Sequence, residues 1–528
     1  MWLLVISVAV FTIILYKFFF STNSKNIFTQ YGIPQVDTSI AVSKLDIFLG
    51  RKSFPDADDY AYKTMDSKKF CGIVEMGSPL ILIKDMELIK KVLIKDFDNF
   101  MNRRELFSEA EIRIRKMLPW LQGEEWKGVR SSVSPTFTTG KIRRMSEYFN
   151  TVGKEWVSSL IEKSKESPGP GGSLTIDVMS YVNQYTIDVI ASAVFGMNAG
   201  TIKDSTSTFA KNAVTISEFT KWQMIKMAIS LQLPKLGRML NIKFFDEEAL
   251  DFFEKILDQG LKARMSGSTT KRNDFLQLLV EAKRGELKTV GSDELSSFEK
   301  EAQVEEKQEK GKVKKQWLTQ QIMNSQSLVF FFAGFSTTSN AITCTAYALA
   351  LHQDVQERLR NEVMKIMKPD GSFDYDDLST LVYMDMVICE ILRMYPAAAR
   401  IERVCLNDYK DAETGLFIPK GVTAAVPVNS MHYDKKYYNN PDKFDPEHFS
   451  PDKKAERVSY AYLPFGMGPR NCVGMRFALV KTKAAVAHLI SHFRIEPTEK
   501  TPVPIKVHWT GIQAFPPKGL ELKLIPLK

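Results

Sequence analysis

The sequence predicts a mainly α-helical protein with small β-sheets and an N-terminal membrane anchor. Apolar residues recur at helical spacing from about residue 87 to residue 396. Alternating, β-rich runs appear on both sides of that stretch, at residues 71–85 and again after Pro396. Residues 2–16 are almost wholly apolar, and they are the basis for the anchor.

The apolar N-terminal run has the length of a membrane span. Up to residue 20 it contains one charge, Lys17, and roughly 19 helical residues at about 1.5 Å each span close to 30 Å of hydrocarbon. A cleaved signal peptide is the rival interpretation, but no basic segment precedes the run and no A-x-A-like site follows it. The first charges, Lys17 and Lys25, come late in the run and after it, which favours a cytosolic body. We expect an uncleaved single-pass anchor at residues 1–20.

The rest of the chain is expected to form one large domain. After a polar linker at residues 21–40, residues 41–528 carry motifs that are scattered along the chain and have to meet in space. With 44% hydrophobic and 25% charged residues, a large core is available. Residues 286–316 are highly charged and almost without aromatic residues, so we predict an exposed, mobile insertion there.

Charge and cysteine content exclude several classes of protein. The net charge is +9, but basic residues are interspersed with acidic ones, which speaks against nucleic-acid binding. A mildly basic surface fits an acidic protein partner or an anionic membrane face. The five cysteines are odd in number and form no C-x-x-C pair, so a disulfide framework or a zinc site is not expected.

The individual elements follow in order. Residues 71–85 predict a hairpin around the turn Gly77-Ser78-Pro79, and residues 167–172 (SPGPGG) predict a break between helices. Residues 219–233 are apolar with interspersed basic residues, which fits either a segment that dips into a membrane or a buried amphipathic helix. A long helix is predicted at about residues 318–350, and a last helix at about 475–492 precedes a β-rich tail.

The most informative pattern, F-x-x-G-x-R-x-C-x-G, lies in the stretch PFGMGPRNCVGMRFA. Its fixed positions are Phe465, Gly468, Arg470, Cys472 and Gly474. An isolated cysteine is most often a small buried hydrophobe. Here, however, glycines permit a tight loop beside a large planar ligand, and the cysteine precedes an apolar helix whose N–H groups lower the pKa of a thiol. Such a thiolate is a good axial iron ligand, and Arg470 can meet a carboxylate of the same ligand.

This ten-residue pattern resembles the haem-binding loop of the cytochrome P450 monooxygenases. The resemblance implies the cytochrome P450 fold, with a long central helix over haem b, and an enzyme that inserts one oxygen atom of O₂ into a small lipophilic substrate. It also implies electrons from NADPH through NADPH-cytochrome reductase, a flavoprotein, with cytochrome b5 as a second possible donor.

Finer similarities suggest a subgroup. The anchor and the segments SPTF, RIERVC and GMRFA are similar to those of animal microsomal members that metabolise drugs and toxins. The charged insertion is similar to that of arthropod members. This similarity implies residence in the endoplasmic reticulum membrane and contact with its lipid. The implied substrates are insecticides and plant toxins, or endogenous lipids and hormones.

Further segments resemble the family's haem-propionate ligands. WKGVR supplies W-x-x-x-R at Trp126 and Arg130, a spacing that alone is weak evidence. RIERVC supplies Arg403, and NRR supplies Arg103, for the same role.

An E-x-x-R pattern occurs twice, at Glu390 and Arg393 and at Glu357 and Arg360. Such a pair is usually a weak surface ion pair. We expect Glu390 and Arg393 to be the buried structural pair of the family, because apolar neighbours surround them: Val387, Ile388 and Leu392. In FDPEHF, His448 stands where the family has an arginine that completes this network, and a histidine also donates hydrogen bonds.

The stretch AGFSTT on the long helix resembles the family's oxygen-activating motif A-G-x-[D/E]-T. Gly334 costs about 1 kcal/mol relative to alanine in a helix; tight packing or a close approach to bound O₂ would explain it. Thr337 is implied to guide protons to the oxygen being activated. Ser336 replaces the usual carboxylate, so our hypothesis is proton delivery through water, slower and with more peroxide released per turnover.

The resemblance also suggests a substrate pocket and a reductase-docking face. The expected pocket residues, each of which could equally belong to the core, are Phe107, Phe331, Phe332, Ala333, Thr337, Ala398, Ala399 and Phe515. The expected basic docking residues, each of which could be an ordinary solvated charge, are Lys127, Lys141, Arg143, Arg144 and Arg476.

Two alternative functions remain open at this point. One is haem-thiolate chemistry without a redox partner, as in an isomerase or dehydratase; the threonine at position 337 argues against it, because those relatives tend to lose it. The other is a non-catalytic protein that binds haem or a lipophile, which intact haem-binding motifs do not exclude.

Overall fold

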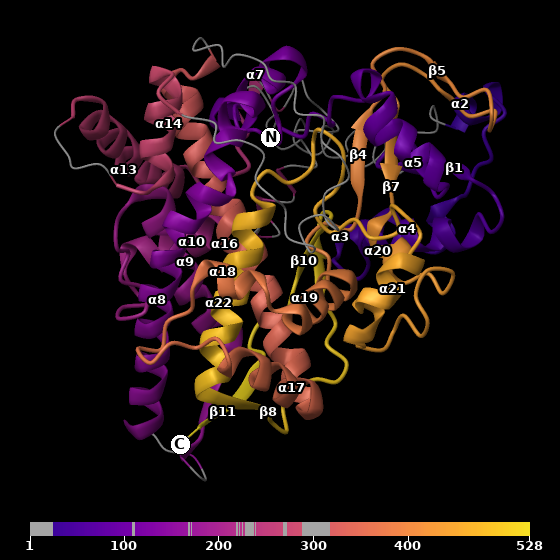
Figure 1. Cartoon of the computed structure of the whole chain (residues 1–528). Coiled ribbons are helices and arrows are strands. Elements are labelled where there is room, and N and C mark those ends of the chain that lie inside the picture. The colour runs from indigo at the N-terminus through magenta and orange to yellow at the C-terminus, as the bar shows by residue number, and fades with distance from the viewer. Residues whose placement is uncertain are drawn as a thin grey trace, which may run out of the picture.

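The computed structural model describes residues 25–527 except 108–110, 167–168, 170–171, 218–219, 221, 224, 227–236, 238, 268–271 and 288–316. Within these residues the chain is mainly helical, and its strands form four small sheets. Helices fill one side of the molecule, and the largest sheet lies at the opposite side (Figure 1). The predicted class, mainly α with small β-sheets, is confirmed.

Helix α16 (Gln320–Leu351) runs through the middle of the helical side (Figure 1). The Thr319 hydroxyl begins it by accepting the N–H of Ile322 at 3.2 Å. None of its 32 residues is charged and most are buried, which is the pattern of a helix surrounded by protein. It packs against α9 (Val178–Phe195), α19 (Val382–Met394), α22 (Met475–His492) and β8 (Phe493–Pro497). Both α16 and α22 lie where the sequence predicts helices.

The other helices lie around α16 or beside the four-stranded sheet (Figure 1). The longer ones are α4 (Phe54–Thr64), α7 (Gly123–Val133), α8 (Thr139–Glu166), α10 (Thr208–Ser217), α13 (Glu247–Met265), α14 (Phe275–Arg284) and α17 (Gln353–Met364). Shorter ones include α2 (Lys25–Gln30), α3 (Lys44–Phe48), α5 (Met86–Lys90), α6 (Ile112–Arg115), α18 (Tyr375–Ser379), α20 (Val428–His432) and α21 (Pro451–Glu456).

The largest sheet has four strands in the order β1-β2-β7-β4. They are β1 (Phe70–Glu75), β2 (Ser78–Ile83), β7 (Thr423–Val426) and β4 (Ile401–Val404). The predicted hairpin is present as β1 and β2, but its turn is at Met76 and Gly77, earlier than predicted. Both residues have positive φ, as a two-residue hairpin turn requires, and Pro79 already belongs to the strand.

A second sheet closes the other end of the helical part. It has the order β3-β11-β8, with β3 (Leu174–Asp177) and β11 (Glu521–Pro526) antiparallel to each other. Two further hairpins are β5 (Tyr409–Lys410) with β6 (Phe417–Ile418), and β9 (His508–Thr510) with β10 (Gln513–Phe515). The break at residues 167–172 therefore leads into a strand before the next helix, and the sequence analysis missed that strand.

Buried apolar side chains form two clusters. The larger one surrounds α16 in the helical part, and the smaller one lies beneath the four-stranded sheet and reaches α4 and α5. The cavity described below is lined by members of both, such as Phe477 of the larger cluster and Leu463 of the smaller. It therefore lies between the two clusters.

Three predicted segments lie wholly or mostly outside the described residues. They are the anchor at 1–20, the charged insertion at 286–316 and the segment at 219–233. In the part of the chain that the structure describes, no helix combines the length and the apolar character needed to cross a membrane.

Candidate active site

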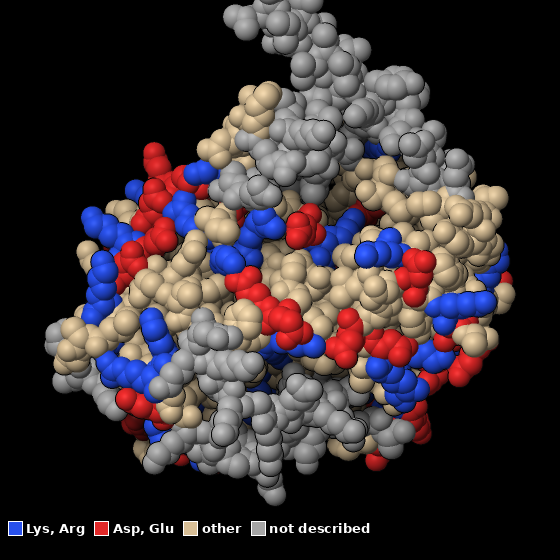
Figure 2. Space-filling model, turned by 90° about the horizontal axis from the view of Figure 1, so that it is seen from above, with Lys and Arg blue, Asp and Glu red and all other residues tan. Residues whose placement is uncertain are grey.

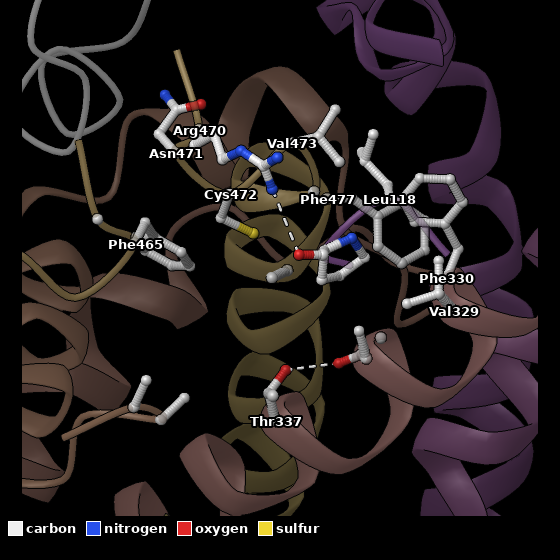
Figure 3. A pocket seen from close by; sticks show the side chains of 18 of the residues that line it. Leu118, Val329, Phe330, Thr337, Phe465, Arg470, Asn471, Cys472, Val473 and Phe477 are labelled. Atoms are coloured by element: carbon white, nitrogen blue, oxygen red, sulfur yellow. Dashed lines mark hydrogen bonds between the residues drawn. The ribbon is translucent and has the colours of Figure 1, made fainter. Parts of the chain in front are cut away.

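A cavity of about 460 Å³ lies where α16, α9, strand β4 and the loop before α22 meet. Its lining is mostly apolar. Figure 3 shows the sulfur of Cys472 and the hydroxyl of Thr337 among its lining side chains. The sequence motifs from the cysteine loop and from the long helix are thus brought to one place.

The loop that carries Cys472 depends on glycine. Gly466 and Gly468 both have a φ of 70°, a left-handed conformation that favours glycine. A Cβ atom at Gly468 would lie 2.0 Å from the carbonyl oxygen of Leu93, so two backbones cross there at a distance that only glycine allows. The N–H of Cys472 donates to the Phe465 carbonyl at 2.9 Å. Four of the five fixed positions of this loop line the cavity, namely Phe465, Arg470, Cys472 and Gly474, whereas Gly468 lies outside the lining.

The Cys472 thiol faces the cavity, and its exposed surface is turned to that interior space. Burial raises the pKa of this thiol, while the N–H of Gly474 and the charges of Arg130 and Arg103 act in the opposite direction. The sequence predicts a lowered pKa from the start of α22. Burial outweighs that effect, because a thiolate loses its hydration there. Coordination to a metal ion would reverse the balance, since it deprotonates a thiol.

Six arginines line the same cavity, and four of them, from separate segments, are the ones that the sequence predicted. Arg103 precedes α6, Arg130 lies on α7, Arg403 lies on β4 and Arg470 belongs to the cysteine loop. Burial, together with the neighbouring charges of Arg103, Arg403 and Arg130, lowers the pKa of Arg470 to about 8. Burial also lowers the pKa of Arg403 well below its usual value, and Arg103 adds to this. Such a cluster of like charges would be stabilised by an anion in the cavity.

The hydrogen bonding of these arginines allows a test of whether haem fits. The Nε atoms of Arg403 and Arg470 are buried and have no hydrogen-bond partner among the described residues. A buried donor without an acceptor costs about 1–3 kcal/mol, and a carboxylate is the strongest partner for a guanidinium. Haem b carries two propionates, and its iron takes a thiolate ligand. The thiol and the incompletely satisfied arginines therefore fit haem b.

Trp126 also belongs to this wall. It is buried on α7, and the guanidinium of Arg470 lies 4.4 Å from its ring centroid. Arg130, one helical turn later, donates to the carbonyl and side-chain oxygens of Asn471 at 3.0 and 2.6 Å. The W-x-x-x-R spacing thus places both predicted residues on the face of α7 that lines the cavity.

One face of α16 forms another wall. Its lining residues recur at helical spacing: Val329, Phe330, Ala333, Gly334, Thr337, Thr338 and Ala341. The Thr337 hydroxyl donates to the Ala333 carbonyl at 2.6 Å (Figure 3), and the Ser336 hydroxyl donates to the Phe332 carbonyl at 3.2 Å. The side-chain nitrogen of Gln513 donates to Ser336 at 3.4 Å.

Gly334 has a packing reason of its own. A Cβ atom there would lie 2.7 Å from Cδ1 of Ile190 on α9, closer than real contacts allow. Gly334 also lines the cavity. Tight packing against α9 therefore explains this glycine, and the close approach to bound O₂ stays a prediction.

The predicted pocket residues are only partly brought together. Ala333, Thr337 and Ala398 line the cavity. Phe331, Ala399 and Phe515 are buried outside its lining, while Phe107 and Phe332 are half-buried outside it. Phe331 packs among rings of other helices, with its ring centroid 4.8 Å from that of Phe253 and 5.0 Å from that of Phe195. Helical spacing explains the difference, because residues 331 and 332 cannot share the face of residues 330, 333 and 337.

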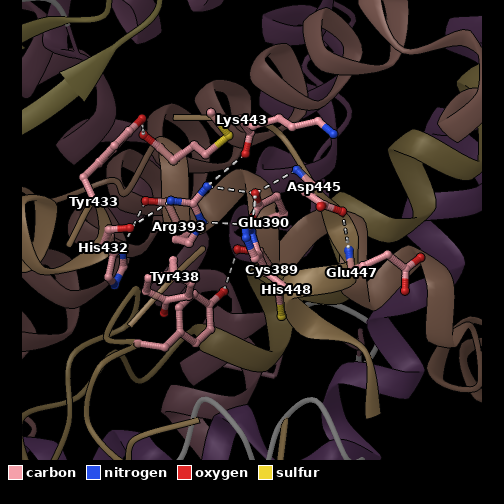
Figure 4. A network of polar contacts seen from close by, with 12 residues as sticks. Cys389, Glu390, Arg393, His432, Tyr433, Tyr438, Lys443, Asp445, Glu447 and His448 are labelled. Atoms are coloured by element: carbon pink, nitrogen blue, oxygen red, sulfur yellow. Dashed lines mark hydrogen bonds and ion pairs between the residues drawn. The ribbon is translucent and has the colours of Figure 1, made fainter. Parts of the chain in front are cut away.

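Glu390 and Arg393 form a fully buried ion pair at the centre of a polar network (Figure 4). Arg393 donates to both carboxylate oxygens of Glu390, at 2.7 and 2.8 Å, and to the carbonyl of His432 at 2.8 Å. Burial alone would raise the pKa of Glu390, but the hydrogen bonds and charges of Arg393 and His448 outweigh burial and hold that pKa below its usual value. The predicted burial of this pair is confirmed.

His448 completes the network as a cation. Its Nδ1 lies 3.1 Å from the Glu390 carboxylate, and its Nε2 lies 2.6 Å from the Asn439 carbonyl. Both partners are acceptors, so both ring nitrogens have to carry hydrogen. Burial would lower the pKa of His448, but its hydrogen bonds and the charge of Glu390 outweigh burial and raise it. The imidazolium thus supplies the positive charge that the family's arginine would bring.

The predicted docking residues do not form a purely basic patch. Lys127 lies 3.2 Å from Glu124 and 3.3 Å from Asp98, and Arg143 lies 2.6 Å from Asp376. On the face drawn in Figure 2, basic and acidic side chains alternate across the coloured residues. The role of the predicted basic residues in docking a reductase stays a prediction.

Several lining residues were missed. Phe137, Ile190, Phe275 and Phe330 line the cavity, and the ring centroids of Phe137 and Phe330 lie 4.8 Å apart. Phe330 could have been found from helical spacing. The other three come from distant segments, and nothing local in the sequence identifies them.

Comparison with known proteins shows the family of this chain. The family model described as "Cytochrome P450" matches residues 59–524, which include every candidate residue of the site. The chain is 33% identical to cytochrome P450 9e2 of Blattella germanica, over 98% of this chain and 97% of that protein. It is 32% identical to cytochrome P450 3A11 of Mus musculus, over 98% and 95% of the two chains. It is 33% identical to probable cytochrome P450 9f2 of Drosophila melanogaster, over 91% and 90%.

Proposed function

The chain belongs to the cytochrome P450 family, and on this premise we propose that it oxidises small lipophilic compounds, with foreign chemicals such as insecticides and plant toxins as the main class. The enzyme is a haem-thiolate monooxygenase that uses haem b, O₂ and electrons from NADPH delivered by a reductase. The alternative substrates are endogenous lipids or hormones, and a substrate panel distinguishes the two classes.

The observation that carries the proposal is the convergence of Cys472, the arginines and Thr337 on one apolar cavity. Cys472 would hold the haem iron through its thiolate, with Phe465 and Gly474 shaping its loop. Trp126 and the four arginines, Arg103, Arg130, Arg403 and Arg470, would hold the propionates. The bound haem supplies the activation of O₂ and the transfer of one oxygen atom to the substrate.

The protein's own part is to exclude water, orient the substrate and guide protons. The apolar lining favours a lipophilic substrate and keeps bulk water out. Thr337 presents its hydroxyl to the cavity, and Ser336 lies one residue away with Gln513 as a partner. We propose that Ser336 relays protons through water, because a hydroxyl is not acidic enough to release a proton as a carboxyl group does.

A substitution at Ser336 tests this relay. Ser336→Asp should raise the product formed per NADPH consumed, because the carboxylate can carry protons itself. The measurement is product and hydrogen peroxide per NADPH in the reductase-coupled enzyme. An unchanged or lower ratio would show that Ser336 is an adequate substitute.

We further propose that residues 1–20 anchor the enzyme in the endoplasmic reticulum membrane, with residues 41–528 as the catalytic domain on the cytosolic side, where the reductase and cytochrome b5 would dock. The apolar run and the charges of Lys17 and Lys25 support this placement. Removal of residues 1–20 should increase the share of protein recovered from the membrane fraction by high salt. No change would contradict the anchor.

The decisive experiment separates a monooxygenase from the alternatives. The reduced protein with CO should give the spectrum of a thiolate-ligated haem, and Cys472→Ala should abolish it. Cys71→Ala is a matched control, because Cys71 is buried on β1 away from the cavity lining. With reductase and NADPH, a panel of insecticides, plant toxins, fatty acids and steroids should yield oxygenated products. A correct spectrum with no product from any of them would support an isomerase or a binding protein instead.

A further inference from the structure

A lysine is buried in the helix that follows the cysteine loop. Lys481 lies on α22 and has 0% of its surface exposed. Its Nζ donates a hydrogen bond of 2.5 Å to the carbonyl oxygen of Gly334 on α16. Gly334 lines the cavity one helical turn before Thr337. Lys481 therefore links the helix that starts beside Cys472 to the turn that carries Thr337.

This burial is costly for a charged group. Among the residues that the structure describes, no carboxylate forms an ion pair with Lys481, and the Phe477 ring centroid lies 5.9 Å from its Nζ. Burial lowers the pKa of Lys481 to about 7. An apolar side chain at this position would avoid the loss of hydration. The cost points to a role for the contact with Gly334.

Lys483, two residues further along α22, shows what a structural lysine looks like here. It pairs with Asp385 on α19 and donates to the Leu378 carbonyl on α18 at 3.0 Å. Those contacts tie three helices together away from the cavity lining. Lys481 differs because its partner is a carbonyl that belongs to the site itself.

The turn of α16 at the cavity is unusual in its hydrogen bonding. Three successive carbonyls, those of Phe332, Ala333 and Gly334, accept from Ser336, Thr337 and Lys481 respectively. Side-chain donors to helical carbonyls compete with the helix's own hydrogen bonds and allow the helix to bend. Of these three donors, Lys481 alone comes from another helix.

We propose that Lys481 is a positioning residue for oxygen activation, which holds the Thr337 turn of α16 in place relative to the cysteine loop through the Gly334 carbonyl. The inference rests on the proposed roles of Cys472 and Thr337. In the productive reaction, the substrate C–H, O₂, NADPH and a proton give the alcohol, water and NADP⁺. If the turn shifts, the Thr337 hydroxyl is misplaced, and O₂, NADPH and a proton give hydrogen peroxide and NADP⁺ instead.

The test compares three variants of the full-length, haem-loaded enzyme with reductase and a lipophile that the wild type oxygenates. Lys481→Met removes the donor, Lys481→Gln keeps a neutral donor, and Lys483→Met is the matched control on the same helix. Product, hydrogen peroxide and NADPH are measured together with KM, the spectrum of the CO complex and the unfolding midpoint.

Lys481→Met should lower product per NADPH by roughly threefold or more, with a matching rise in peroxide. KM should stay within about twofold, because Lys481 does not contribute to the described cavity lining. Lys481→Gln should recover part of the loss. Lys483→Met should lower the unfolding midpoint and leave product per NADPH unchanged.

The inference is overturned if product per NADPH is unchanged in Lys481→Met, or if it falls equally in Lys483→Met. Lys481 would then be a structural residue. If Lys481→Met does not load haem, Lys481→Gln is tested in its place. A product per NADPH equal to that of the wild type in Lys481→Gln would also overturn the inference. A wild type that shows the CO spectrum but forms no product removes the proposed function and this inference together.

Discussion

The pairs Glu390–Arg393 on α19 and Glu357–Arg360 on α17 have the same spacing and opposite surroundings. Both side chains of the first pair are fully buried. In the second pair, the Glu357 side chain is 59% exposed and Arg360 is 10% exposed. Arg360 has other partners besides Glu357, since it donates to the carbonyls of Ile490 and Phe493 at 2.9 and 3.2 Å and to the side-chain oxygen of Gln356 at 2.7 Å.

The difference teaches that spacing alone does not define a structural pair. On α19 the glutamate has three donors, from Arg393, His448 and the Asp445 N–H, and every charge is compensated inside the protein. On α17 the arginine ties its helix to the end of α22, and the glutamate contributes little. The buried pair should therefore matter far more for stability than the exposed one.

The largest effect is expected from Arg393→Met. It leaves Glu390 buried without its main partner, and breaking a buried pair costs about 3–5 kcal/mol. The urea midpoint should fall accordingly, and the haem-loaded fraction of expressed protein should drop. A loss below about 1 kcal/mol would show that His448 and the Asp445 N–H are sufficient partners for Glu390.

An intermediate and pH-dependent effect is expected at His448. Its folded pKa is raised above the usual value, so its contribution to stability is full below the unfolded pKa of about 6.5 and is lost as pH rises through the folded pKa. His448→Gln should cost on the order of 1–3 kcal/mol near pH 6 and less near pH 9. His448→Arg should remove the dependence on pH. Unfolding midpoints of the three proteins between about pH 6 and pH 9 measure this, and parallel curves for wild type and His448→Gln would contradict the cationic histidine.

The smallest effect is expected from Glu357→Ala. The exposed carboxylate should contribute less than about 1 kcal/mol, and its contribution should shrink further with salt. Arg360→Ala should cost more than Glu357→Ala, because two buried carbonyls then lose their donor. A larger loss of stability in Glu357→Ala than in Arg360→Ala would contradict this difference between the two pairs.

The sequence predicted which of the two Glu–Arg pairs is buried. Val387, Ile388 and Leu392 predicted a buried helix around Glu390, and the structure confirms that burial. The loop of Cys472 was recognisable because its glycines and its arginine lie within one short stretch. Both features depend on residues that are close together in the chain, so a short stretch of sequence is enough to predict them.

Other features could not be found locally. The contact of Gly334 with Ile190 and the reach of Lys481 to the Gly334 carbonyl join elements far apart in the chain. The strand β3 is too short for its alternation to stand out, and it exists because β11 pairs with it. Phe331 was misplaced because its neighbours were taken in sequence order, whereas a helix groups residues three and four apart.

The sheet that contains β11 sets an order of events during synthesis. The strand β11 lies between β3 and β8, yet it follows every other described element along the chain. As the polypeptide leaves the ribosome, residues 174–177 emerge early and have no partner strand until β11 arrives. The helical core around α16 can collapse before that sheet is complete. Nascent chains should therefore pass through a state in which the helices are packed and residues 174–177 are still unpaired.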